Sequence, residues 1–340
     1  MTQETPLLTV ENLQVHFFLD QGVVRAVDGV SFSLDQGRTL GIVGESGSGK
    51  SVIGQAILRI VPHPGRIVGG NILLKMNGSA SGGTVLDLVT LNPHSKLARS
   101  IRGRDVAMVF QEPMNSFSPV HTIGNQIIEA IRLHTDVSVM EARNRAIEML
   151  AKVGIPQPEH RIDSYPHQFS GGMRQRAMIA MALVCNPRVL IADEPTTALD
   201  VTVQAQILEL LRGLQEEFGM AIIFISHNLG VIAEISHEVL VIYFGKVMER
   251  APVEVIFSEP RHPYTKALLK SIPSIDTPVR TRLATIEGTL PNPHAFIRGC
   301  PFFERCGQCE ATTSCRDEPY SLTRLGDRHY VACPQMCVRM

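Results

Sequence analysis

The sequence lacks long hydrophobic runs and a recognisable export signal. No stretch reaches the roughly 18 uninterrupted apolar residues that a membrane-spanning helix needs. Residues 1–6 also lack the basic and then apolar pattern of a signal peptide. We therefore expect a soluble, cytoplasmic chain that meets a membrane only through partners.

An excess of charge of either sign is also absent. The chain has 32 Lys and Arg against 33 Asp and Glu, a formal net charge of −1, which gives no electrostatic reason to expect a nucleic-acid partner. With 340 residues, 44% of them hydrophobic, it exceeds the size of about 250–300 residues at which single cores stop growing. We expect a main domain over residues 1–270 and a smaller extension over 271–340.

Cysteine is nearly absent before residue 300, where Cys185 stands alone and is expected to be a buried small hydrophobe. In a cytoplasmic protein, clustered cysteines favour metal or iron–sulfur ligation over disulfides. Thiolates suit an iron–sulfur cluster or a Cys₄ zinc site, and reduced free thiols in a loose tail are the alternative. The clustered residues are Cys300, Cys306, Cys309, Cys315, Cys333 and Cys337.

Hydrophobic periodicity predicts strands in the first hundred residues. Residues 7–43 alternate with period two and end in an apolar run. A helix is expected over 51–60. Residues 63–104 read as β structure with an exposed loop, because Pro-rich and Gly/Ser-rich pieces interrupt short strand-like runs.

The rest of the main domain predicts a helical insert followed by alternating helices and strands. The insert covers about 112–170, with Ser138 and Glu141 placed as a capping box. Asp200 is placed to cap the helix expected over 201–218, and Gly219 is placed to end it. Alternating elements imply an α/β sheet. We expect helices over 171–184 and 201–218, and strands over 189–192, 221–225 and 239–243.

The apolar run that ends at residue 43 leads into a glycine-rich loop of the form G-x-x-x-x-G-K-[ST]. In this pattern the backbone N–H groups wrap phosphates at a helix N-terminus. Lys50 is expected to reach the β- and γ-phosphates, and the Ser51 hydroxyl to bind Mg²⁺. A chance Gly/Ser loop is the alternative, but the loop has the strand before it and the helix after it that the motif requires. Its residues are Gly44, Glu45, Ser46, Gly47, Ser48, Gly49, Lys50 and Ser51.

Two adjacent acids, Asp193 and Glu194, follow the apolar strand predicted over 189–192. Two carboxylates side by side at the end of a strand repel each other unless they bind a cation or take part in the same reaction. Asp193 suits Mg²⁺, and Glu194 suits the general base that polarises an attacking water. Taken alone, the pair could also be a solvated strand end.

Gln111 and His227 each come directly after an apolar run. In α/β sheets, ligand groups are presented at the carboxyl ends of strands. His227 is therefore expected to contact the γ-phosphate and the attacking water, and Gln111 to sense Mg²⁺ and water. Each residue alone would also pass for an ordinary structural one.

These motifs occur in the order typical of ATP-binding-cassette (ABC) ATPases, the nucleotide-binding subunits of ABC transporters. Residues 7–270 resemble that family, including the segments Phe169-Ser170-Gly171-Gly172 and Ala198-Leu199-Asp200. The resemblance implies a P-loop NTPase core with an N-terminal antiparallel β subdomain and a helical insert. It also implies ATP and Mg²⁺ as ligands.

The resemblance further implies a head-to-tail dimer with two ATP molecules at its interface. Ser170 and Gly172 would then contact the γ-phosphate held by the opposite subunit, and Asp200 would communicate across the interface. Ser170, Gly171 and Gly172 open the helix expected over 171–184 and offer N–H groups to an anion. The family usually reads Leu-Ser-Gly-Gly-Gln, whereas this chain has Phe169 and Met173 at the outer positions. Neither change removes the phosphate-facing residues.

Two more assignments follow from the same resemblance. An aromatic residue near the N-terminus would stack on adenine, and Phe17 is the best match, with Phe18 as its rival. Residues 112–130 would receive a short helix from a membrane subunit. Met114 and Phe117 could belong to that docking surface or to the core of the insert.

Residues 261–269 and 299–306, with the later cysteines, resemble the C-terminal region of dipeptide/oligopeptide importer ATPases. This implies an importer subunit at the cytoplasmic face of the membrane. Its partners would be two permease subunits, a second related ATPase or another copy of the chain, and indirectly an extracytoplasmic binding protein. Relatives carry dipeptides, oligopeptides, oligosaccharides or nickel. A soluble ABC ATPase acting on nucleic acid is the alternative outside transport.

The same relatives place a [4Fe–4S] cluster in this region. The cysteines that match their pattern are Cys300, Cys306, Cys315 and Cys333, with zinc as the alternative metal. Cys309 and Cys337 are additional to the pattern, so the ligating quartet stays open.

Overall fold

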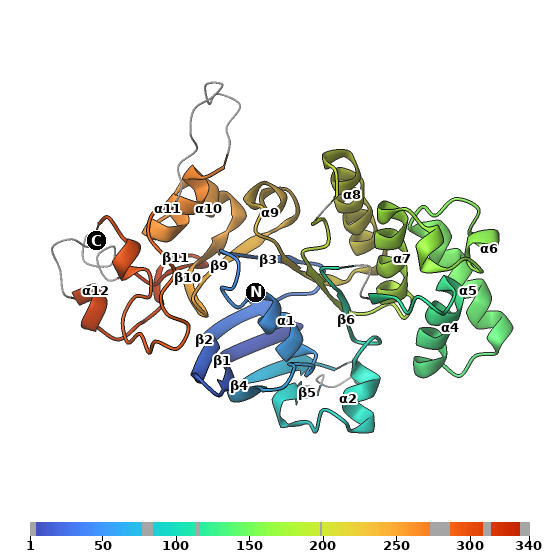
Figure 1. Ribbon diagram of the computed structural model, residues 1–340, viewed down its shortest axis with the longest axis horizontal. Coiled ribbons are helices and arrows are strands. Elements are labelled where there is room, and N and C mark those ends of the chain that lie inside the picture. Colours follow the sequence, from blue (N-terminus) through green and yellow to red (C-terminus); the bar gives the residue numbers. More distant parts are fainter. Residues whose placement is uncertain are drawn as a thin grey trace. The chain divides into compact units, whose positions relative to one another are not determined.

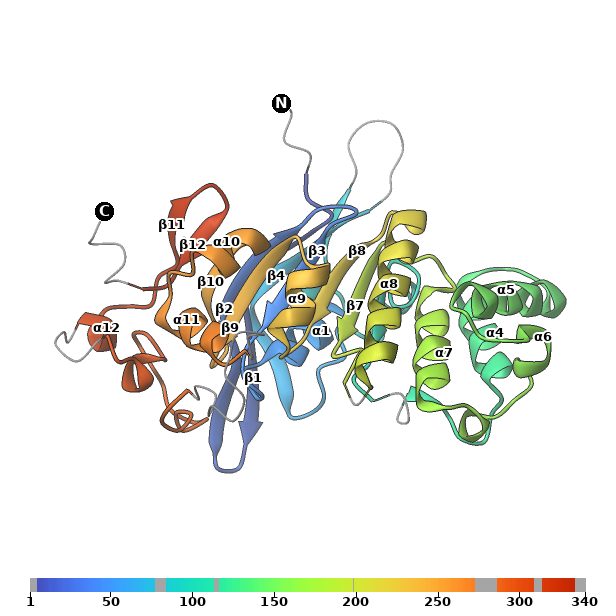
Figure 2. The ribbon, with the colours of Figure 1, turned by 90° about the horizontal axis from the view of Figure 1, so that it is seen from above.

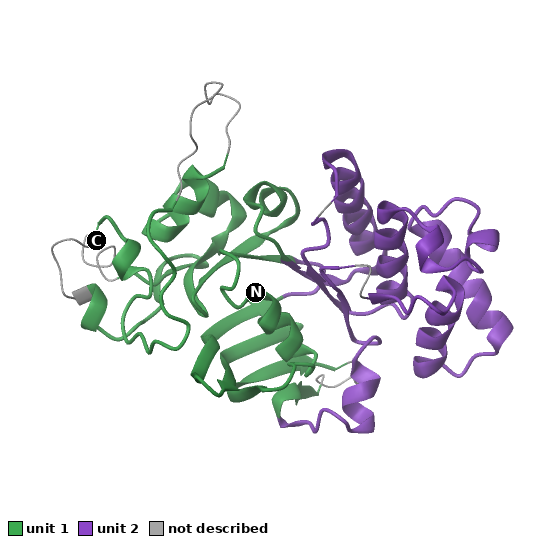
Figure 3. Ribbon diagram, in the orientation of Figure 1, with its two compact units in different colours: residues 1–34, 39–89, 225–340 green, residues 35–38, 90–224 purple. Residues whose placement is uncertain are grey.

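In the computed structural model, the structure describes residues 5–76, 84–112, 116–197, 199–272, 286–308 and 314–333. The chain divides into two compact units (Figure 3). Unit 1 holds residues 1–34, 39–89 and 225–340, and unit 2 holds residues 35–38 and 90–224. Within the described ranges, every helix is too short or too polar to cross a membrane.

Unit 1 contains an antiparallel sheet of four strands in the order β2-β1-β4-β5. In Figure 1, β2, β1 and β4 lie side by side. Apolar residues such as Leu13, Val15 and Val30 are fully buried, as expected for strands with one face on a core. The strands are β1 (Leu8–Leu19), β2 (Gly22–Leu34), β4 (Gly65–Lys75) and β5 (Val85–Asp87).

A second set of strands in unit 1 runs in the order β11-β12-β10-β9-β3. Strands β3 and β9 are parallel, and the other pairs are antiparallel. Two strands of the C-terminal extension, β11 and β12, thus continue this sheet beyond β10. The strands are β3 (Thr39–Val43), β9 (Glu238–Tyr243), β10 (Lys246–Pro252), β11 (Thr323–Gly326) and β12 (His329–Val331).

The helices of unit 1 connect and flank these strands. They are α1 (Lys50–Ile57), α9 (Leu229–Ile235), α10 (Val253–Ser258), α11 (Pro263–Lys270), α12 (Ser314–Asp317), and the 3₁₀ helices η1 (Leu88–Thr90) and η3 (Phe303–Arg305). Along the chain, unit 1 ends at Val89 and unit 2 resumes at Thr90, within η1.

Unit 2 contains strands in the order β8-β7-β6, with β6 and β7 parallel. Figure 2 shows α4 to α7 gathered at one side of this unit, and α7 packs on both α4 and α5. The strands are β6 (Val106–Val109), β7 (Val189–Asp193) and β8 (Ala221–Ile225). The helices are α2 (Lys96–Ile101), α4 (Ile123–His134), α5 (Val139–Lys152), α6 (Pro158–Arg161), η2 (Pro166–Gln168), α7 (Gly171–Leu183) and α8 (Val201–Phe218).

The α/β fold with an antiparallel β subdomain and a helical insert is confirmed. Asp200 caps α8, where its Oδ1 accepts from Val203 N at 2.9 Å. Gly219 ends the same helix at a φ of 63°. Ser138 caps α5 by accepting from Glu141 N at 3.2 Å.

The first helix ends earlier than the expected 51–60. Arg59 has a φ of 57°, in the left-handed region, so the α-helical geometry stops before it. The N–H groups of Arg59 and Ile60 bond back to the carbonyl oxygens of Ala56 and Gln55 at 3.0 and 2.9 Å. The chain therefore turns away from the helix after Ile57.

In the helical insert, Phe117 is only 5% exposed. Of the two uses predicted for this residue, burial favours the core of the insert over the docking surface. Met114 lies outside the described residues.

Candidate functional site

The glycine-rich loop joins β3 to α1 in unit 1, as its motif requires. A Cβ atom on Gly44 would lie 2.1 Å from the carbonyl oxygen of Ile242. Gly49 has a φ of 99°, and a Cβ there would lie 2.0 Å from the carbonyl oxygen of Ala26. Backbone packing on β2 and β9 therefore requires glycine at both positions, beyond any need for close approach to a phosphate.

Lys50 is the first residue of α1 and is 5% exposed. Its Nζ donates to the carbonyl oxygens of Gly44 and Glu45, at 2.9 Å each. The ammonium group is thus held over the loop, at the N-terminus of a helix whose first N–H groups lack partners within the helix. Half-buried Ser51 follows in the same turn, so a positive charge, a hydroxyl and the N-terminus of a helix lie together. This combination suits a phosphate chain with its metal ion.

His227 lies in unit 1, just past the level at which β3 ends. The preceding residue, Ser226, donates its backbone N–H to the carbonyl oxygen of Ile42 in β3 at 3.1 Å. Asn228 N donates to Ser226 Oγ at 3.0 Å, and Asn228 Oδ1 caps α9 by accepting from Gly230 N at 2.9 Å. The fixed residues on both sides hold the backbone of exposed His227 in place.

The acidic pair lies in unit 2. Asp193 is the last residue of β7 and is 4% exposed, and Glu194 follows it half-buried. Gln111 lies just beyond β6, and its Nε2–H donates a hydrogen bond to Glu194 Oε2 at 3.0 Å. Since β6 and β7 are parallel neighbours, the structure brings Gln111 and Glu194 together at one edge of the sheet.

Thr197 is a contact of Glu194 that the sequence analysis missed. Its Oγ1 donates to Glu194 Oε2 at 2.9 Å, and its N–H donates to the Glu194 carbonyl oxygen at 3.2 Å. Glu194 itself has a φ of 47°, a left-handed conformation that is strained for a non-glycine residue. Two hydrogen bonds to Oε2 and a fixed backbone hold the Glu194 carboxylate in place at the end of β7. The only signal in the sequence was a hydroxyl three residues after the acid.

The segment around Ser170 opens α7 in unit 2. Ser170 is exposed, and its Oγ caps the helix by accepting from Met173 N at 3.3 Å. A Cβ on Gly172 would lie 3.2 Å from Val203 Cγ1, whereas one on Gly171 would meet nothing within 4 Å. The N-terminus of α7 therefore lies beside that of α8, which Asp200 caps. Two helix N-termini side by side form a surface that favours an anion.

The two candidates for adenine stacking differ in their surroundings within unit 1. The Phe17 ring is half-buried, and a Cβ on Gly65 would lie 2.7 Å from its Cε1. Phe18 is 46% exposed, with the Arg66 guanidinium 5.8 Å from its ring centroid. None of the contacts among the described residues favours one ring over the other, so stacking on adenine by Phe17 or by Phe18 stays a prediction.

The four cysteines of the predicted quartet are all buried: Cys300, Cys306, Cys315 and Cys333. Burial, with smaller contributions from the charges of the other three thiols, raises the pKa of the Cys300 thiol to about 12. Cys300 N donates to the Cys315 carbonyl oxygen at 2.8 Å. The four thiols thus share one region of the extension.

Cysteine thiols are the ligand type that an iron–sulfur cluster or a zinc ion needs, but the side chains are not arranged as a metal site. Among the described residues, no group of three or more His, Cys, Asp or Glu side chains is arranged to hold a metal ion. The predicted metal site is therefore not confirmed. Cys309 and Cys337 lie outside the described residues, and Cys185 is half-buried, with its pKa raised by burial.

Comparison with known proteins agrees with this geometry. Residues 27–197 match the family model "ABC transporter", and residues 248–315 match "Oligopeptide/dipeptide transporter, C-terminal region". The chain is 46% identical to the dipeptide transport ATP-binding protein DppD of Escherichia coli strain K12, over 96% of each chain. It is also 46% identical to DppD of Haemophilus influenzae, over 95% of this chain and 93% of that one.

A solved structure supports the same conclusion. The cbiO1 protein of Clostridium perfringens, described as part of an ABC transporter complex, aligns with a TM-score of 0.59 at 26% identity. The alignment covers 75% of this chain and 92% of that chain. The chain is therefore an ATPase of the ABC transporter family that carries the oligopeptide/dipeptide transporter C-terminal region.

Proposed function

We propose that the chain is the ATP-hydrolysing subunit of a membrane importer for dipeptides or oligopeptides. The observation that carries this proposal is the match to DppD over nearly the full length of both chains, cassette and C-terminal region together. A purely nucleic-acid-directed ABC ATPase would not need this C-terminal region. The near-neutral charge also gives no support to a polynucleotide partner.

In the proposed reaction, Lys50 and the N–H groups at the start of α1 hold the β- and γ-phosphates of ATP. Bound Mg²⁺, held by Ser51, Asp193 and Gln111, would neutralise developing charge on the phosphate oxygens. Glu194 accepts the proton of the attacking water, and His227 orients the γ-phosphate. The bonds from Gln111 and Thr197 to Glu194 fix the base, so that little reorganisation is needed when the water attacks the γ-phosphate.

We propose that ATP closes a dimer and that hydrolysis reopens it. Ser170 and Gly172 would contact the γ-phosphate bound by the opposite subunit, Gly171 would offer its N–H to the same nucleotide, and Asp200 would lie at the same interface. The adjacent N-termini of α7 and α8 support this role, because they present a positive dipole surface to an anion. The opposite subunit is a second copy or a related ATPase, and Phe17, or its rival Phe18, would stack on adenine.

The proposed partners outside the dimer are two membrane permease subunits and, through them, an extracytoplasmic binding protein. The chain would then work at the cytoplasmic face of the membrane. On the insert, Val120 is 73% exposed next to buried Phe117. Residues 112–130, which include Val120, would form the surface that receives a short helix from a permease subunit.

Loss of peptide uptake is the expected result of deleting the gene. Cells without this chain should fail to take up a labelled dipeptide or tripeptide, and re-expression of the wild-type chain should restore uptake. Uptake of free amino acids by other routes serves as the control. If instead uptake of oligosaccharide or nickel is lost and peptide uptake is normal, the proposed substrate is wrong.

We also propose that Cys300, Cys306, Cys315 and Cys333 hold a [4Fe–4S] cluster, with zinc as the alternative metal. Burial of all four thiols in one region supports this, since thiolate ligation lowers the cost of charging a buried thiol. The anaerobically purified chain should contain iron and sulfide, and Cys306→Ser should lose both, while the control Cys185→Ser keeps them. Zinc without sulfide would identify the alternative, and a metal-free chain would show that the thiols are free.

A further inference from the structure

Every polar group of Glu45, the second residue of the phosphate loop, is held by a specific partner. Its backbone N–H donates to Tyr264 Oη, and its carbonyl oxygen accepts from Lys50 Nζ, both at 2.9 Å. Its carboxylate accepts from Arg305, with Nη1 to Oε2 at 2.7 Å and Nη2 to Oε1 at 3.0 Å. The loop motif leaves this position open to any residue. The contacts are therefore a feature of this chain that the motif does not explain.

Arg305 belongs to the C-terminal extension and is 260 residues away from Glu45 in sequence. Besides the carboxylate, its guanidinium donates to Tyr243 Oη at 3.1 Å and to the carbonyl oxygens of Ile286 and Glu287 at 3.1 and 3.0 Å. These bonds, with the two to Glu45, use all five N–H donors of a guanidinium. The bond to Glu45 is the largest cause that raises the pKa of Arg305. These hydrogen bonds together fix the orientation of the Arg305 guanidinium.

The ion pair is largely shielded from water. The Arg305 side chain is 5% exposed and the Glu45 side chain 24%. Three buried rings back the pair: the centroid of Tyr243 lies 4.7 Å from that of Tyr264 and 5.4 Å from that of Phe302. Poor access of solvent strengthens a charge pair compared with one on an open surface.

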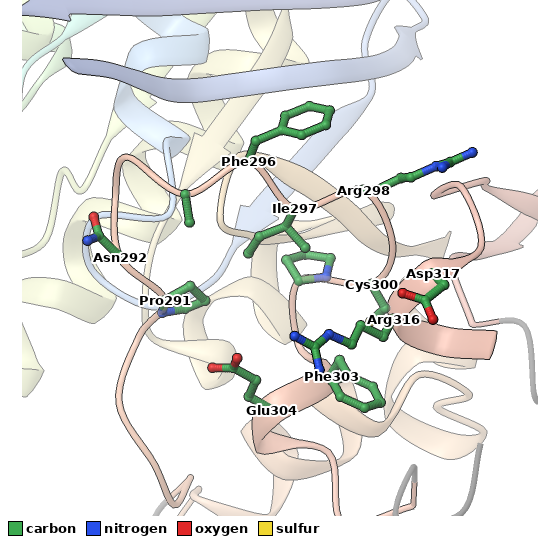
Figure 4. A pocket seen from close by; sticks show the side chains of 12 residues that line it. Pro291, Asn292, Phe296, Ile297, Arg298, Cys300, Phe303, Glu304, Arg316 and Asp317 are labelled. Atoms are coloured by element: carbon green, nitrogen blue, oxygen red, sulfur yellow. The ribbon is translucent and has the colours of Figure 1, made fainter. Parts of the chain in front are cut away.

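Arg305 is also set apart from its neighbours in the 3₁₀ helix η3. Phe303 and Glu304 line a pocket of about 510 Å³ in the extension (Figure 4). Arg305 is not among its lining residues and instead reaches Glu45. The short helix therefore presents two residues to the pocket and the third to the phosphate loop.

We propose that Arg305 is a positioning residue for ATP binding by the phosphate loop. By fixing Glu45, it fixes the carbonyl oxygens of Gly44 and Glu45, which in turn hold the Lys50 ammonium. This inference rests on the proposed function, because it assumes that the loop binds ATP. The extension thereby completes a site whose phosphate-contacting residues all lie elsewhere in the chain.

Replacing Arg305 with Met in the full-length chain should weaken ATP binding about tenfold, as expected for one coupled ion pair. The KM for ATP should rise by a similar factor while kcat changes little, because neither Arg305 nor Glu45 touches the attacking water. Glu45→Gln should have a similar effect, and the double variant should be no worse than either single one. Arg305→Lys should restore only part of the affinity, since Lys lacks the two-pronged geometry. Arg298→Met, an exposed arginine of the same extension, is the matched control.

The outcomes separate this inference from the proposed function. If the wild-type chain does not bind ATP, the proposed function fails. If it binds ATP and both Arg305→Met and Glu45→Gln bind equally well, Arg305 has no positioning role. Additive losses in the double variant would also refute it, because they would show that the two residues act independently. If Arg305→Met does not fold, Glu45→Gln alone decides, since its side chain is partly exposed.

Discussion

Glu194→Gln will bind ATP as the wild type does but will hydrolyse it at least about 100-fold more slowly, the range expected when a general base is lost. Glutamine has nearly the same shape and keeps an oxygen that can accept from Gln111 Nε2 and Thr197 Oγ1. It cannot accept a proton from the attacking water. Phosphate release at saturating Mg²⁺ and ATP measures the rate, and equilibrium binding of ATP measures the affinity.

The same variant tests the proposed dimer. Because ATP stays bound, Glu194→Gln should accumulate as a dimer in the presence of ATP, as measured by light scattering on the full-length chain with its partner ATPase where one is needed. Glu209→Gln, an exposed acid on α8 in the same unit, is the control and should hydrolyse ATP normally. Normal hydrolysis by Glu194→Gln would show that another group is the base.

Lys50→Met will lower the affinity for ATP by up to about 100-fold, since hydrogen bonds to charged groups contribute roughly 1.5–3 kcal/mol each. Methionine fills nearly the same space as lysine but carries no charge and no donor. The carbonyl oxygens of Gly44 and Glu45 would also lose their shared partner, so the loop itself would be less well ordered. Isothermal titration with ATP measures the loss.

Two comparisons make the Lys50 result specific. Lys270→Met removes an exposed lysine at the end of α11 and should leave ATP affinity unchanged. Thermal unfolding of Lys50→Met without nucleotide shows whether the chain still folds. Unchanged ATP affinity in a folded Lys50→Met would mean that the loop is not the phosphate site.

The parts of the site that the sequence could predict are those that local rules control. The phosphate loop needs only the order strand, glycines, lysine and helix, and the structure has β3, the loop and α1 in that order. Gln111 and Glu194 each follow an apolar strand, and parallel strands place such residues at one edge. The caps Ser138 and Asp200 depend on a single turn of helix, so a pattern of four residues was enough to predict them.

The parts that could not be predicted depend on contacts between distant segments. Arg305 meets Glu45 across 260 residues, and neither periodicity nor spacing relates the two positions. Thr197 lies in a turn whose left-handed start at Glu194 has no signal in the residue type. For the cysteines, residue type and clustering predict a metal site, but their spacing does not predict how the chain arranges the four thiols.

The contact between Glu45 and Arg305 has a consequence for protein synthesis. When a ribosome has translated the first 270 residues, every side chain proposed to touch ATP has been made, but the arginine that holds Glu45 has not. If Arg305 positions the phosphate loop as proposed, the nucleotide site reaches its final form only in chains that are close to complete. On this proposal, a polypeptide that ends before Arg305 would retain all the nucleotide motifs and would bind ATP more weakly than the full-length chain.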